Sequence, residues 1–522
     1  MRSAEHIPLF PLSKNVFFII AACLVWFKFF AFHLYLNQCG KEAIFLPDSA
    51  SYVNLAGSLI KNKAFAQIDQ NGVLVPEIFR TPGYPIFLAI LSGVFQFDFI
   101  RIVYVQIFLS ILAALIVYKI MGVVDPGLKR LCALFMLFDF SVTYNSMLMI
   151  TETLFTCVLT GFLYFFVIYL NSGKTRDLLI AAFLSAVCVY IRPIGYYLPY
   201  TIIACYFVLA YRKSPEKVIA HSVLFIITVT CLLSLWHVRN YTQLGEWRFS
   251  SIGDVSYGGD GIIGSYQRLN VSGVSPWVFY PWNFLNLIRR VLTHTTLMTL
   301  PDAALTAMFK IITLSWIDLW KLGLIMGLVL IKKNIYLRFF FVVIVYLTAA
   351  PVFAANLGAG ERFRVPMYPC IALIATIGWH HIYTIVKTCP YHNIRKSHKM
   401  ALPILCLSLY ALCKFIYACA QAAWGGEIEL IAKSLIAIFS IWFVCRCLYQ
   451  DDEWAGWVCL PGTFIFSLFG MLEFIILQKT GALPLEPHPL FNAFMLTALP
   501  VLLFMAFITL LFSKLKTGKD DT

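Results

Sequence analysis

The sequence predicts an all-α, polytopic membrane protein with about 14 transmembrane helices, and three observations support that prediction. Of the 522 residues, 60% are hydrophobic and only 13% are charged, and the mean hydropathy is +0.80, far from the values of soluble domains. Apolar runs of about 17–25 residues recur along the chain, each long enough to cross a hydrocarbon core of about 30 Å as a helix. The alternating pattern of a membrane β-barrel is absent, so helices must satisfy the backbone hydrogen bonds in lipid.

The predicted spans follow one another along the whole chain. The first is too long for a signal-peptide core and is followed by no small-residue cleavage site, so we expect it to be retained. The full set lies at approximately residues 16–37, 102–120, 131–149, 153–171, 178–193, 195–211, 219–236, 306–331, 337–355, 365–386, 401–420, 431–448, 455–477 and 490–513.

The short apolar stretch 84–100 decides the orientation of every later span. If it does not span, the short loops on one side of the membrane collect Lys and Arg, as cytoplasmic loops do. We therefore predict that 84–100 lies at or dips into the outer interface, that both termini are cytoplasmic, and that the chain resides in the plasma (inner) membrane. The basic residues on that side include Lys14, Lys119, Lys129, Arg130, Lys174, Arg176, Arg212, Lys213, Lys332, Lys333, Lys387 and Lys396.

The formal net charge of +14 does not indicate a nucleic-acid partner, because the basic residues sit in short loops between apolar runs and form no single patch. Membrane orientation and anionic lipid headgroups explain it better. The 15 Cys lie mostly inside apolar runs without a CxxC motif, so we interpret them as small buried hydrophobic residues.

Two hydrophilic segments, here named the first long loop (38–101) and the second long loop (237–305), face away from the cytoplasm in this topology. Any site should lie on these loops or on the short turns at the same membrane face. Residues 1–390 are predicted to form one transmembrane unit, and residues 391–522 a C-terminal extension of four further spans.

Asp48 opens a short amphipathic segment of the first long loop. Tyr52 and Ala56 recur at helical spacing, which predicts a helix lying along the membrane interface with Asp48 or Ser49 as its N-cap. Further along, the Pro-Gly-Tyr-Pro cluster at 82–85 suits a rigid turn that re-enters the membrane. From spacing alone, a capping role and a chemical role for Asp48 both stay open.

Five short motifs occur in order at the predicted outer face. They are Asp48-Ser49-x-x-Tyr52 with Arg80-Thr81-Pro82-Gly83-Tyr84-Pro85, Thr151-Glu152-Thr153-Leu154-Phe155, Arg192-Pro193-x-Gly195, Trp236-x-x-Arg239-Asn240-Tyr241, and Arg362-x-Arg364-x-Pro366. With these motifs the chain resembles the GT-C glycosyltransferases, specifically the bacterial relatives of protein mannosyltransferases and aminoarabinose transferases, over roughly residues 15–390.

The resemblance implies a GT-C type bundle with interfacial helices in the first long loop, and it implies a reaction. A sugar moves from a polyprenyl-phosphate donor to a lipid, glycan or protein acceptor outside the cytoplasm, with inversion at the anomeric carbon. Such a site needs cations near the phosphate and a base near the acceptor, and Asp48 would be that base. Tyr52, Arg80 and Tyr84 of the same loop are further candidates.

Three arginines are the candidates for binding the donor phosphate: Arg239, Arg362 and Arg364. A guanidinium group matches phosphate oxygens in a two-pronged geometry and stays protonated. Each of the three lies beside an apolar span on the outer side, against the positive-inside tendency. Snorkelling to lipid headgroups is the alternative, for Arg80 as well.

The outer turns carry the remaining candidates. Glu152 sits where two spans turn, as a functional carboxylate or as a residue that caps the next helix through Thr151. Arg192 could bind the donor or pair with Glu152 or Asp48. His237 could help hold phosphate or be purely structural.

No metal or other cofactor is predicted, although a divalent ion at Asp48 with Glu152 or another carboxylate stays open, since no ligand cluster has convincing spacing. A transporter or flippase of lipid-linked sugars is the alternative function, which intramembrane lysines such as Lys28 would suit, and a lipid-carrier-dependent polymerase or ligase is a third. The charged residues crowd one membrane face and no inverted repeat is visible, which favours the transferase. The sequence identifies neither the sugar nor the acceptor.

Overall fold

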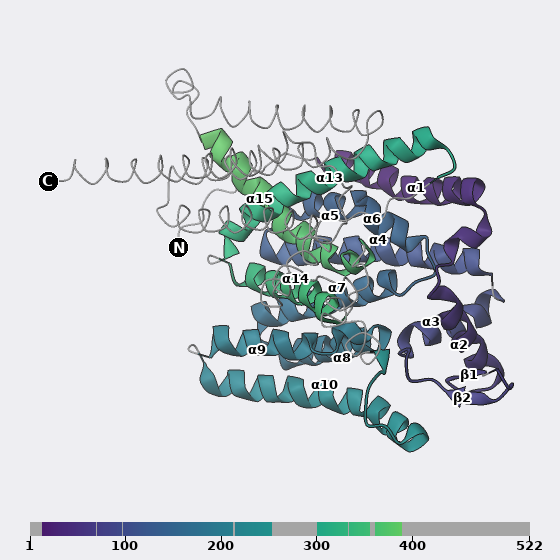
Figure 1. Cartoon of the computed structure of the whole chain (residues 1–522). Coiled ribbons are helices and arrows are strands. Elements are labelled where there is room, and N and C mark those ends of the chain that lie inside the picture. Colours follow the sequence, from purple (N-terminus) through teal and green to yellow (C-terminus); the bar gives the residue numbers. More distant parts are fainter. Residues whose placement is uncertain are drawn as a thin grey trace, which may run out of the picture. The chain divides into compact units, whose positions relative to one another are not determined.

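The structure is a computed structural model that describes residues 13–68, 70–96, 98–211, 214–252, 300–331, 334–354 and 361–388, all within one compact unit of the chain. These residues are almost entirely helical (Figure 1). The four spans predicted between residues 401 and 513 lie outside the described residues, as does most of the second long loop.

Nine helices form the bulk of the described part of this unit. They are α1 (Lys14–Cys39), α4 (Phe99–Val124), α7 (Glu152–Ser172), α8 (Thr175–Ile191), α9 (Leu198–Ala210), α10 (Pro215–Leu244), α13 (Ala303–Val329), α14 (Ile335–Ala354) and α15 (Tyr368–Thr388). Within the described residues, five helices are long and apolar enough to cross a membrane: α1, α4, α7, the segment Pro193–Ala210 that includes α9, and α10. The chain is therefore a multi-pass membrane protein.

The single span predicted at 131–149 is wrong. The structure breaks this stretch into α5 (Lys129–Phe138) and α6 (Phe140–Ser146) at Asp139. The Asp139 backbone is extended, and its side chain accepts a hydrogen bond of 2.8 Å from the amide of Val142. Asp favours this capping geometry over a helix interior, and the apolar residues on both sides hid the break from a hydropathy window.

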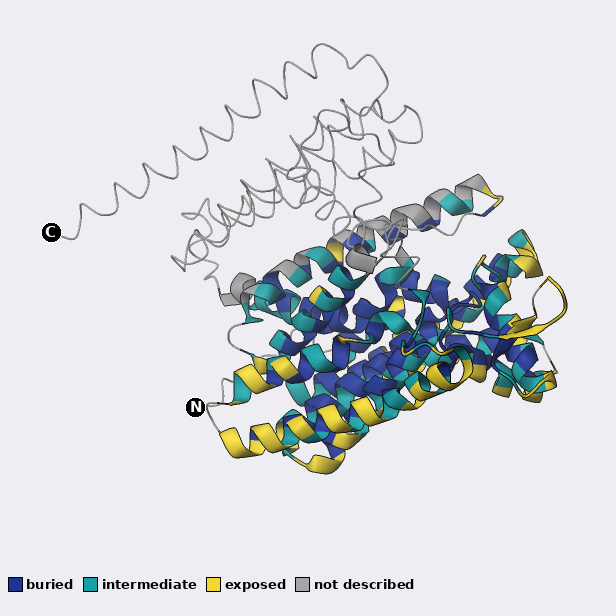
Figure 2. Ribbon diagram, turned by 60° about the horizontal axis from the view of Figure 1, so that its bottom comes forward, coloured by how far each residue is buried: buried dark blue, intermediate teal, exposed yellow. Residues whose placement is uncertain are grey.

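Lipid-facing and core-facing residues alternate with helical periodicity on α4. Its buried face includes Ile102, Val103, Gln106, Ile107, Ser110, Ala113, Ala114 and Val117. Phe108, Leu112 and Leu115 are exposed on the opposite face. The outer surfaces of other helices, such as α10, are exposed in the same way (Figure 2). An apolar face without a protein partner is what contact with lipid tails requires.

The first long loop folds into two short helices and a hairpin. Helix α2 (Ser49–Lys61) packs against α3 (Gly83–Phe95), and strands β1 (Ala66–Ile68) and β2 (Leu74–Pro76) pair antiparallel between them. Helix α3 has 13 residues and is about 20 Å long, shorter than a hydrocarbon core of about 30 Å.

Gly83 sets the position of α3 against α8. A Cβ atom at this glycine would lie 2.7 Å from the carbonyl carbon of Tyr190, closer than side-chain carbons approach backbone. Thr81 adds a hydrogen bond of 3.2 Å to the carbonyl oxygen of Ile191. The start of α3 is therefore packed directly on the last turn of α8, immediately before Arg192.

Candidate active site

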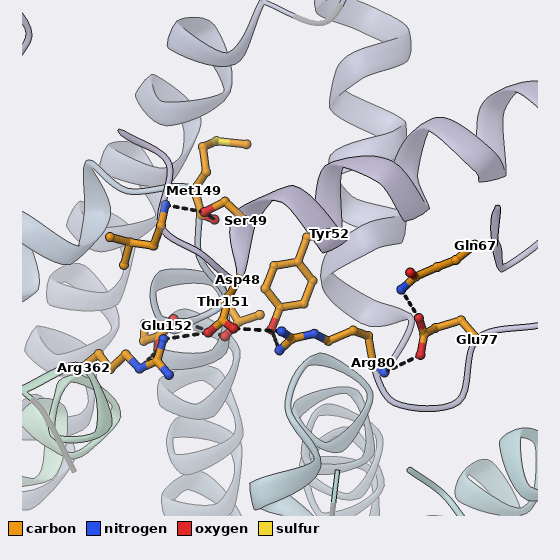
Figure 3. Close-up of polar contacts among 11 residues, drawn as sticks. Asp48, Ser49, Tyr52, Gln67, Glu77, Arg80, Met149, Thr151, Glu152 and Arg362 are labelled. Carbon is orange, nitrogen blue, oxygen red and sulfur yellow. Dashed lines mark hydrogen bonds and ion pairs between the residues drawn. The ribbon is translucent and has the colours of Figure 1, made fainter. Parts of the chain in front are cut away.

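Asp48 lies at the N-terminus of α2, between two arginines that are distant in sequence (Figure 3). One carboxylate oxygen accepts a hydrogen bond of 2.8 Å from Arg80, and the other accepts one of 2.7 Å from Arg362. The side chain of Asp48 makes no capping bond to the backbone of α2. The carboxylate is thus held by two cations, and the capping alternative raised by the sequence is not the one that forms.

Glu152 begins α7 and provides a second carboxylate beside the first. It is 2% exposed, and its Oε1 lies 2.9 Å from Nη1 of Arg192 and 4.0 Å from Nε of Arg362. Arg362 therefore bridges the two carboxylates. Thr151 also donates a hydrogen bond of 3.2 Å to Glu152.

Together these residues form a line of alternating charges, here named the charge chain: Arg80, Asp48, Arg362, Glu152 and Arg192. Three guanidinium groups and two carboxylates give it a net charge of +1. Its members come from the first long loop, the start of α7, the end of α8 and the short helix η5 (Glu361–Phe363). A line with one excess positive charge is suited to holding one anionic group.

A small hydrogen-bonded junction positions Asp48 relative to Glu152. Ser49 donates 2.8 Å to the carbonyl oxygen of Met149, and the Met149 amide donates 2.8 Å to the carbonyl oxygen of Ile44. Both bonds join the chain at and just before the start of α2 to the segment just before α7, and Figure 3 shows Ser49 beside Met149. The two carboxylates are consequently fixed on one rigid joint.

Glu77 organises the backbone that presents Arg80. Its buried carboxylate accepts hydrogen bonds from the amides of Phe79, at 2.5 Å, and Arg80, at 3.1 Å, and it also binds Gln67. The Arg80 guanidinium then donates 3.1 Å to the hydroxyl of Tyr52 and lies 4.8 Å from the centre of that ring. The sequence analysis missed Glu77, although its position three residues before Arg80 is a signal for a backbone cap.

Arg192 and Arg362 flank one aromatic ring. Their guanidinium carbons lie 5.4 Å and 5.1 Å from the centre of Phe363. Such contacts favour a fixed orientation of both cations at modest cost in solvation. Of the alternatives considered for Arg192, pairing with Glu152 is the contact that forms.

Arg80 and Arg362 also determine the ionisation of the site. Burial alone would raise the pKa of Asp48, but the hydrogen bond from Arg80 and the charge of Arg362 lower that pKa below its ordinary value. Burial raises the pKa of the Tyr52 phenol, against the opposing charge of Arg80. Asp48 is therefore ionised at neutral pH, and Tyr52 keeps its proton.

Arg239 makes contacts outside the charge chain. It donates hydrogen bonds of 2.6 Å to the carbonyl oxygen of Glu77 and 2.8 Å to that of Phe65. These two residues flank β2 and β1 at the open end of the hairpin. Its guanidinium carbon lies 4.8 Å from the ring centre of Trp236. In this arrangement Arg239 clamps the first long loop to α10, and its predicted binding of phosphate remains a prediction.

Arg364 is fully buried and points toward other helices. Its Nε donates 3.2 Å to the hydroxyl of Tyr368, and its guanidinium carbon lies 6.0 Å from the ring centre of Trp320. Although it is two residues from Arg362, the two side chains contact different parts of the fold.

Tyr84 and His237 form their hydrogen bonds with residues outside the charge chain, although the ring of Tyr84 packs edge-on against that of Tyr52 at 5.2 Å. Tyr84 is buried and donates 2.9 Å to Gln106, whose amide donates 2.7 Å to the carbonyl oxygen of Leu148. The ring of His237 hydrogen-bonds the hydroxyl of Tyr196 at 3.0 Å and stacks on Trp247. Both residues hold neighbouring segments together.

No group of three or more His, Cys, Asp or Glu side chains within the described residues is placed to hold a metal ion. The oxygens of Asp48 and one oxygen of Glu152 already contact guanidinium groups. A cation that binds Asp48 or Oε1 of Glu152 would compete with these arginines.

The fold and the charge chain define an α-helical multi-pass membrane protein with a polar centre suited to an anionic substrate. Residues 79–237 match the family model described as dolichyl-phosphate-mannose-protein mannosyltransferase. This segment contains Arg80, Glu152 and Arg192 but not Asp48 or Arg362. The resemblance to the GT-C membrane glycosyltransferases, predicted from the motifs, is thereby confirmed.

Solved structures to which this chain shows similarity include ArnT from Cupriavidus metallidurans. Its apo form is 11% identical, with a TM-score of 0.44, over 89% of this chain and 77% of ArnT. The form bound to undecaprenyl phosphate is 11% identical, with a TM-score of 0.43, over 90% and 78%. The archaeal oligosaccharyltransferase AglB from Archaeoglobus fulgidus, in complex with an inhibitory peptide and a dolichol-phosphate, is 10% identical with a TM-score of 0.45; 85% of this chain covers 56% of AglB. No curated protein sequence matches this chain significantly.

Proposed function

We propose that this protein transfers a sugar from a polyprenyl-phosphate donor to an acceptor hydroxyl at the extracytoplasmic face of the plasma (inner) membrane, with inversion. The observation that carries the proposal is the charge chain, in which a carboxylate at the head of α2 lies between arginines of separate loops. The match to the family of dolichyl-phosphate-mannose-protein mannosyltransferases supports a donor in which the sugar is linked to a lipid phosphate.

Asp48 acts as the general base. The acceptor oxygen attacks the anomeric carbon of the sugar as its proton passes to the Asp48 carboxylate. The bond between that carbon and the phosphate oxygen breaks, and its electron pair leaves on the polyprenyl phosphate. A single displacement of this kind inverts the configuration, and general-base assistance of this type contributes about 10²–10⁴-fold in rate.

The charges of the site change in step with those of the substrate. A sugar linked through a phosphodiester carries one negative charge, which the net +1 of the charge chain balances. As the reaction proceeds, the leaving phosphate gains a second negative charge while proton uptake by Asp48 raises the charge chain to +2. The attraction is therefore stronger in the transition state than in the ground state, which is the condition for catalysis.

Donor binding also activates the base. Arg362 is shared between Asp48 and Glu152, and a phosphate that attracts Arg362 removes one of the two hydrogen bonds that Asp48 accepts. The pKa of Asp48 then rises from its lowered value, because an opposing cation has moved away. Asp48 therefore becomes a better proton acceptor only when the donor is in place.

The test uses purified protein in proteoliposomes with a panel of undecaprenyl-phosphate-linked radiolabelled hexoses and pentoses, and with source-cell membrane extract as acceptor. Transfer of label by the wild type and its loss in Asp48→Asn are expected. Asp98→Asn is the matched control, because Asp98, like Asp48, stands immediately before a helix and pairs with an arginine, Arg101, at 2.9 Å. Asp48-independent translocation of labelled carrier, without transfer from any donor, would establish the transporter alternative instead.

A further inference from the structure

A second group of charged side chains lies outside the candidate active site, inside the helix bundle. It consists of Lys28 on α1, Asp139 between α5 and α6, and Arg364 before α15, here named the inner charge cluster. Each is at most 1% exposed. Burying an ionised group in a membrane protein costs several kcal/mol unless it is paired, so three such groups together indicate a specific role.

All three side chains converge on the short helix α6. Asp139 accepts a hydrogen bond of 2.9 Å from the indole nitrogen of Trp316 on α13. Lys28 donates 2.7 Å to the hydroxyl of Thr143, which in turn donates 2.8 Å to the carbonyl oxygen of Asp139. The positive charges of Arg364 and Lys28 partly offset the cost of burying the Asp139 carboxylate.

Arg364 completes the link through one aromatic residue. It donates to the hydroxyl of Tyr368 at 3.2 Å, and that hydroxyl donates to Ser141 of α6 at 3.3 Å. The carbonyl oxygen of Arg364 accepts 2.8 Å from the amide of Met367, which closes the short helix η6 (Val365–Met367). The segment that carries Arg362 is therefore fastened to α6 through Tyr368, six residues beyond Arg362, and Arg364 orients the Tyr368 hydroxyl.

Helix α6 leads directly into the other half of the candidate site. It ends at Ser146, and the chain then passes through Met149, which binds both Ser49 and Ile44, before reaching Glu152. The inner charge cluster is thus connected both to the segment that leads to Glu152 and to the segment that carries Arg362.

We propose that the inner charge cluster is a positioning device that holds the 361–367 loop against α6, so that Arg362 meets Asp48 and Glu152. The catalytic meaning of this role rests on the proposed function, but the geometric claim does not. A cluster that served only to pack helices would leave the Arg362–Asp48 contact unchanged when weakened.

The experiment measures how accessible protonated Asp48 is, without any substrate. A carbodiimide reacts with protonated carboxyl groups, and mass spectrometry of the purified full chain gives the extent of Asp48 modification across a pH series. Two variants weaken the cluster from different elements: Asp139→Asn, which keeps the size of the side chain, and Trp316→Phe, which keeps an aromatic ring. Arg362→Met is the positive control, because it removes the contact itself.

We expect both cluster variants to move the titration of Asp48 upward, with several-fold faster modification at a fixed pH, and by less than Arg362→Met does. Asp177→Asn is the matched control and should behave as wild type. Asp177 is also a buried carboxylate, but it lies in the first turn of α8, where it accepts a hydrogen bond of 2.9 Å from Ser172 at the end of α7 opposite Glu152.

Unchanged modification in folded Trp316→Phe and Asp139→Asn, beside a shifted Arg362→Met, would overturn the positioning role. If Arg362→Met also failed to move the titration, the Arg362–Asp48 pairing itself would be refuted, and the positioning role with it. A failure of the transferase proposal is detected in a different experiment, as an absence of label transfer by the wild type. It does not change how the carbodiimide result is interpreted.

Discussion

Replacement of Arg362 tests the charge chain at its central member. Arg362 contacts Asp48 through Nη1 at 2.7 Å and approaches Glu152 through Nε at 4.0 Å, so it uses two edges of the guanidinium group. A lysine has one charged nitrogen and cannot maintain both contacts. A methionine has a similar length and removes the charge, which lowers the net charge of the charge chain from +1 to 0.

The expected losses follow from these two changes. Removing one preorganised charged donor from a developing negative charge costs about 10²–10³-fold in rate, which we expect for Arg362→Met. Arg362→Lys keeps the charge, and loss of the charge-assisted hydrogen bond to Asp48, about 1.5–3 kcal/mol, predicts about a 10–100-fold loss in kcat/KM. The KM for the acceptor should change little, because Arg362 is assigned to the donor.

The assay is label transfer from the polyprenyl-phosphate donor at saturating acceptor, with kcat and KM for the donor measured separately. Arg101→Met is the matched control, because Arg101 pairs with Asp98 at 2.9 Å on an exposed surface and should retain wild-type activity. The reasoning fails if Arg362→Met keeps the wild-type kcat/KM, or if Arg101→Met is equally damaging.

Four further outcomes are expected. Arg239→Met should lower the thermal unfolding temperature in detergent, since its two hydrogen bonds from a charged group contribute about 1.5–3 kcal/mol each. The KM for the donor should stay near the wild-type value. A raised KM with unchanged stability would show phosphate binding instead. Glu77→Ala should reduce kcat/KM about tenfold by releasing the backbone that presents Arg80, and wild-type kinetics would contradict this. Because the pKa of Asp48 is lowered in the folded state, the ionised carboxylate should contribute fully to stability above about pH 5, and this contribution should disappear as the pH falls through the lowered pKa. The difference in unfolding free energy between wild type and Asp48→Asn should therefore shrink in acid. A difference that stays constant with pH would refute this expectation. EDTA should leave transfer unchanged, since guanidinium groups occupy Asp48 and one oxygen of Glu152, and a loss restored by a divalent cation would reverse this expectation.

Composition and local pattern predicted much of the helical architecture. The predicted span at 16–37 corresponds to α1 at Lys14–Cys39, and that at 153–171 to α7 at Glu152–Ser172. Hydropathy succeeds here because lipid leaves the backbone no alternative to a continuous helix. It failed at Asp139, where one side chain satisfies the backbone of a new helix and so permits a break that apolar neighbours conceal.

The sequence also predicted which residues to examine, but not which of them touch. Asp48 and Arg362 are 314 positions apart, and no local pattern relates them. The two members of the Arg362-x-Arg364 motif have nearly the same sequence context, yet one contacts Asp48 and the other is buried beside Tyr368. On a short 3₁₀ turn, residues two apart point in different directions, so their contacts depend on tertiary packing.

Asp139 shows where the sequence held a signal that went unused. An ionisable residue within a predicted span is uncommon enough to suggest a functional or structural role by itself. Its partners Lys28 and Trp316 come from helices far away in sequence, so the signal names the residue but not its contacts. Intramembrane charges of opposite sign, considered as a set, would have indicated the inner charge cluster.

The charge chain also explains why carboxylates stand among the arginines of a site that must bind phosphate. Arg80, Arg192 and Arg362 come from three loops, and three like charges in one place would repel one another before a donor arrives. Asp48 and Glu152 remove that repulsion and hold the three loops together, at the cost of competing with the phosphate for the same guanidinium groups. Donor affinity is therefore limited by the strength of the Arg362–Asp48 contact. The same competition couples donor binding to release of the base, so a variant that tightens donor binding by weakening that contact should also expose a basic Asp48 to water and increase donor hydrolysis.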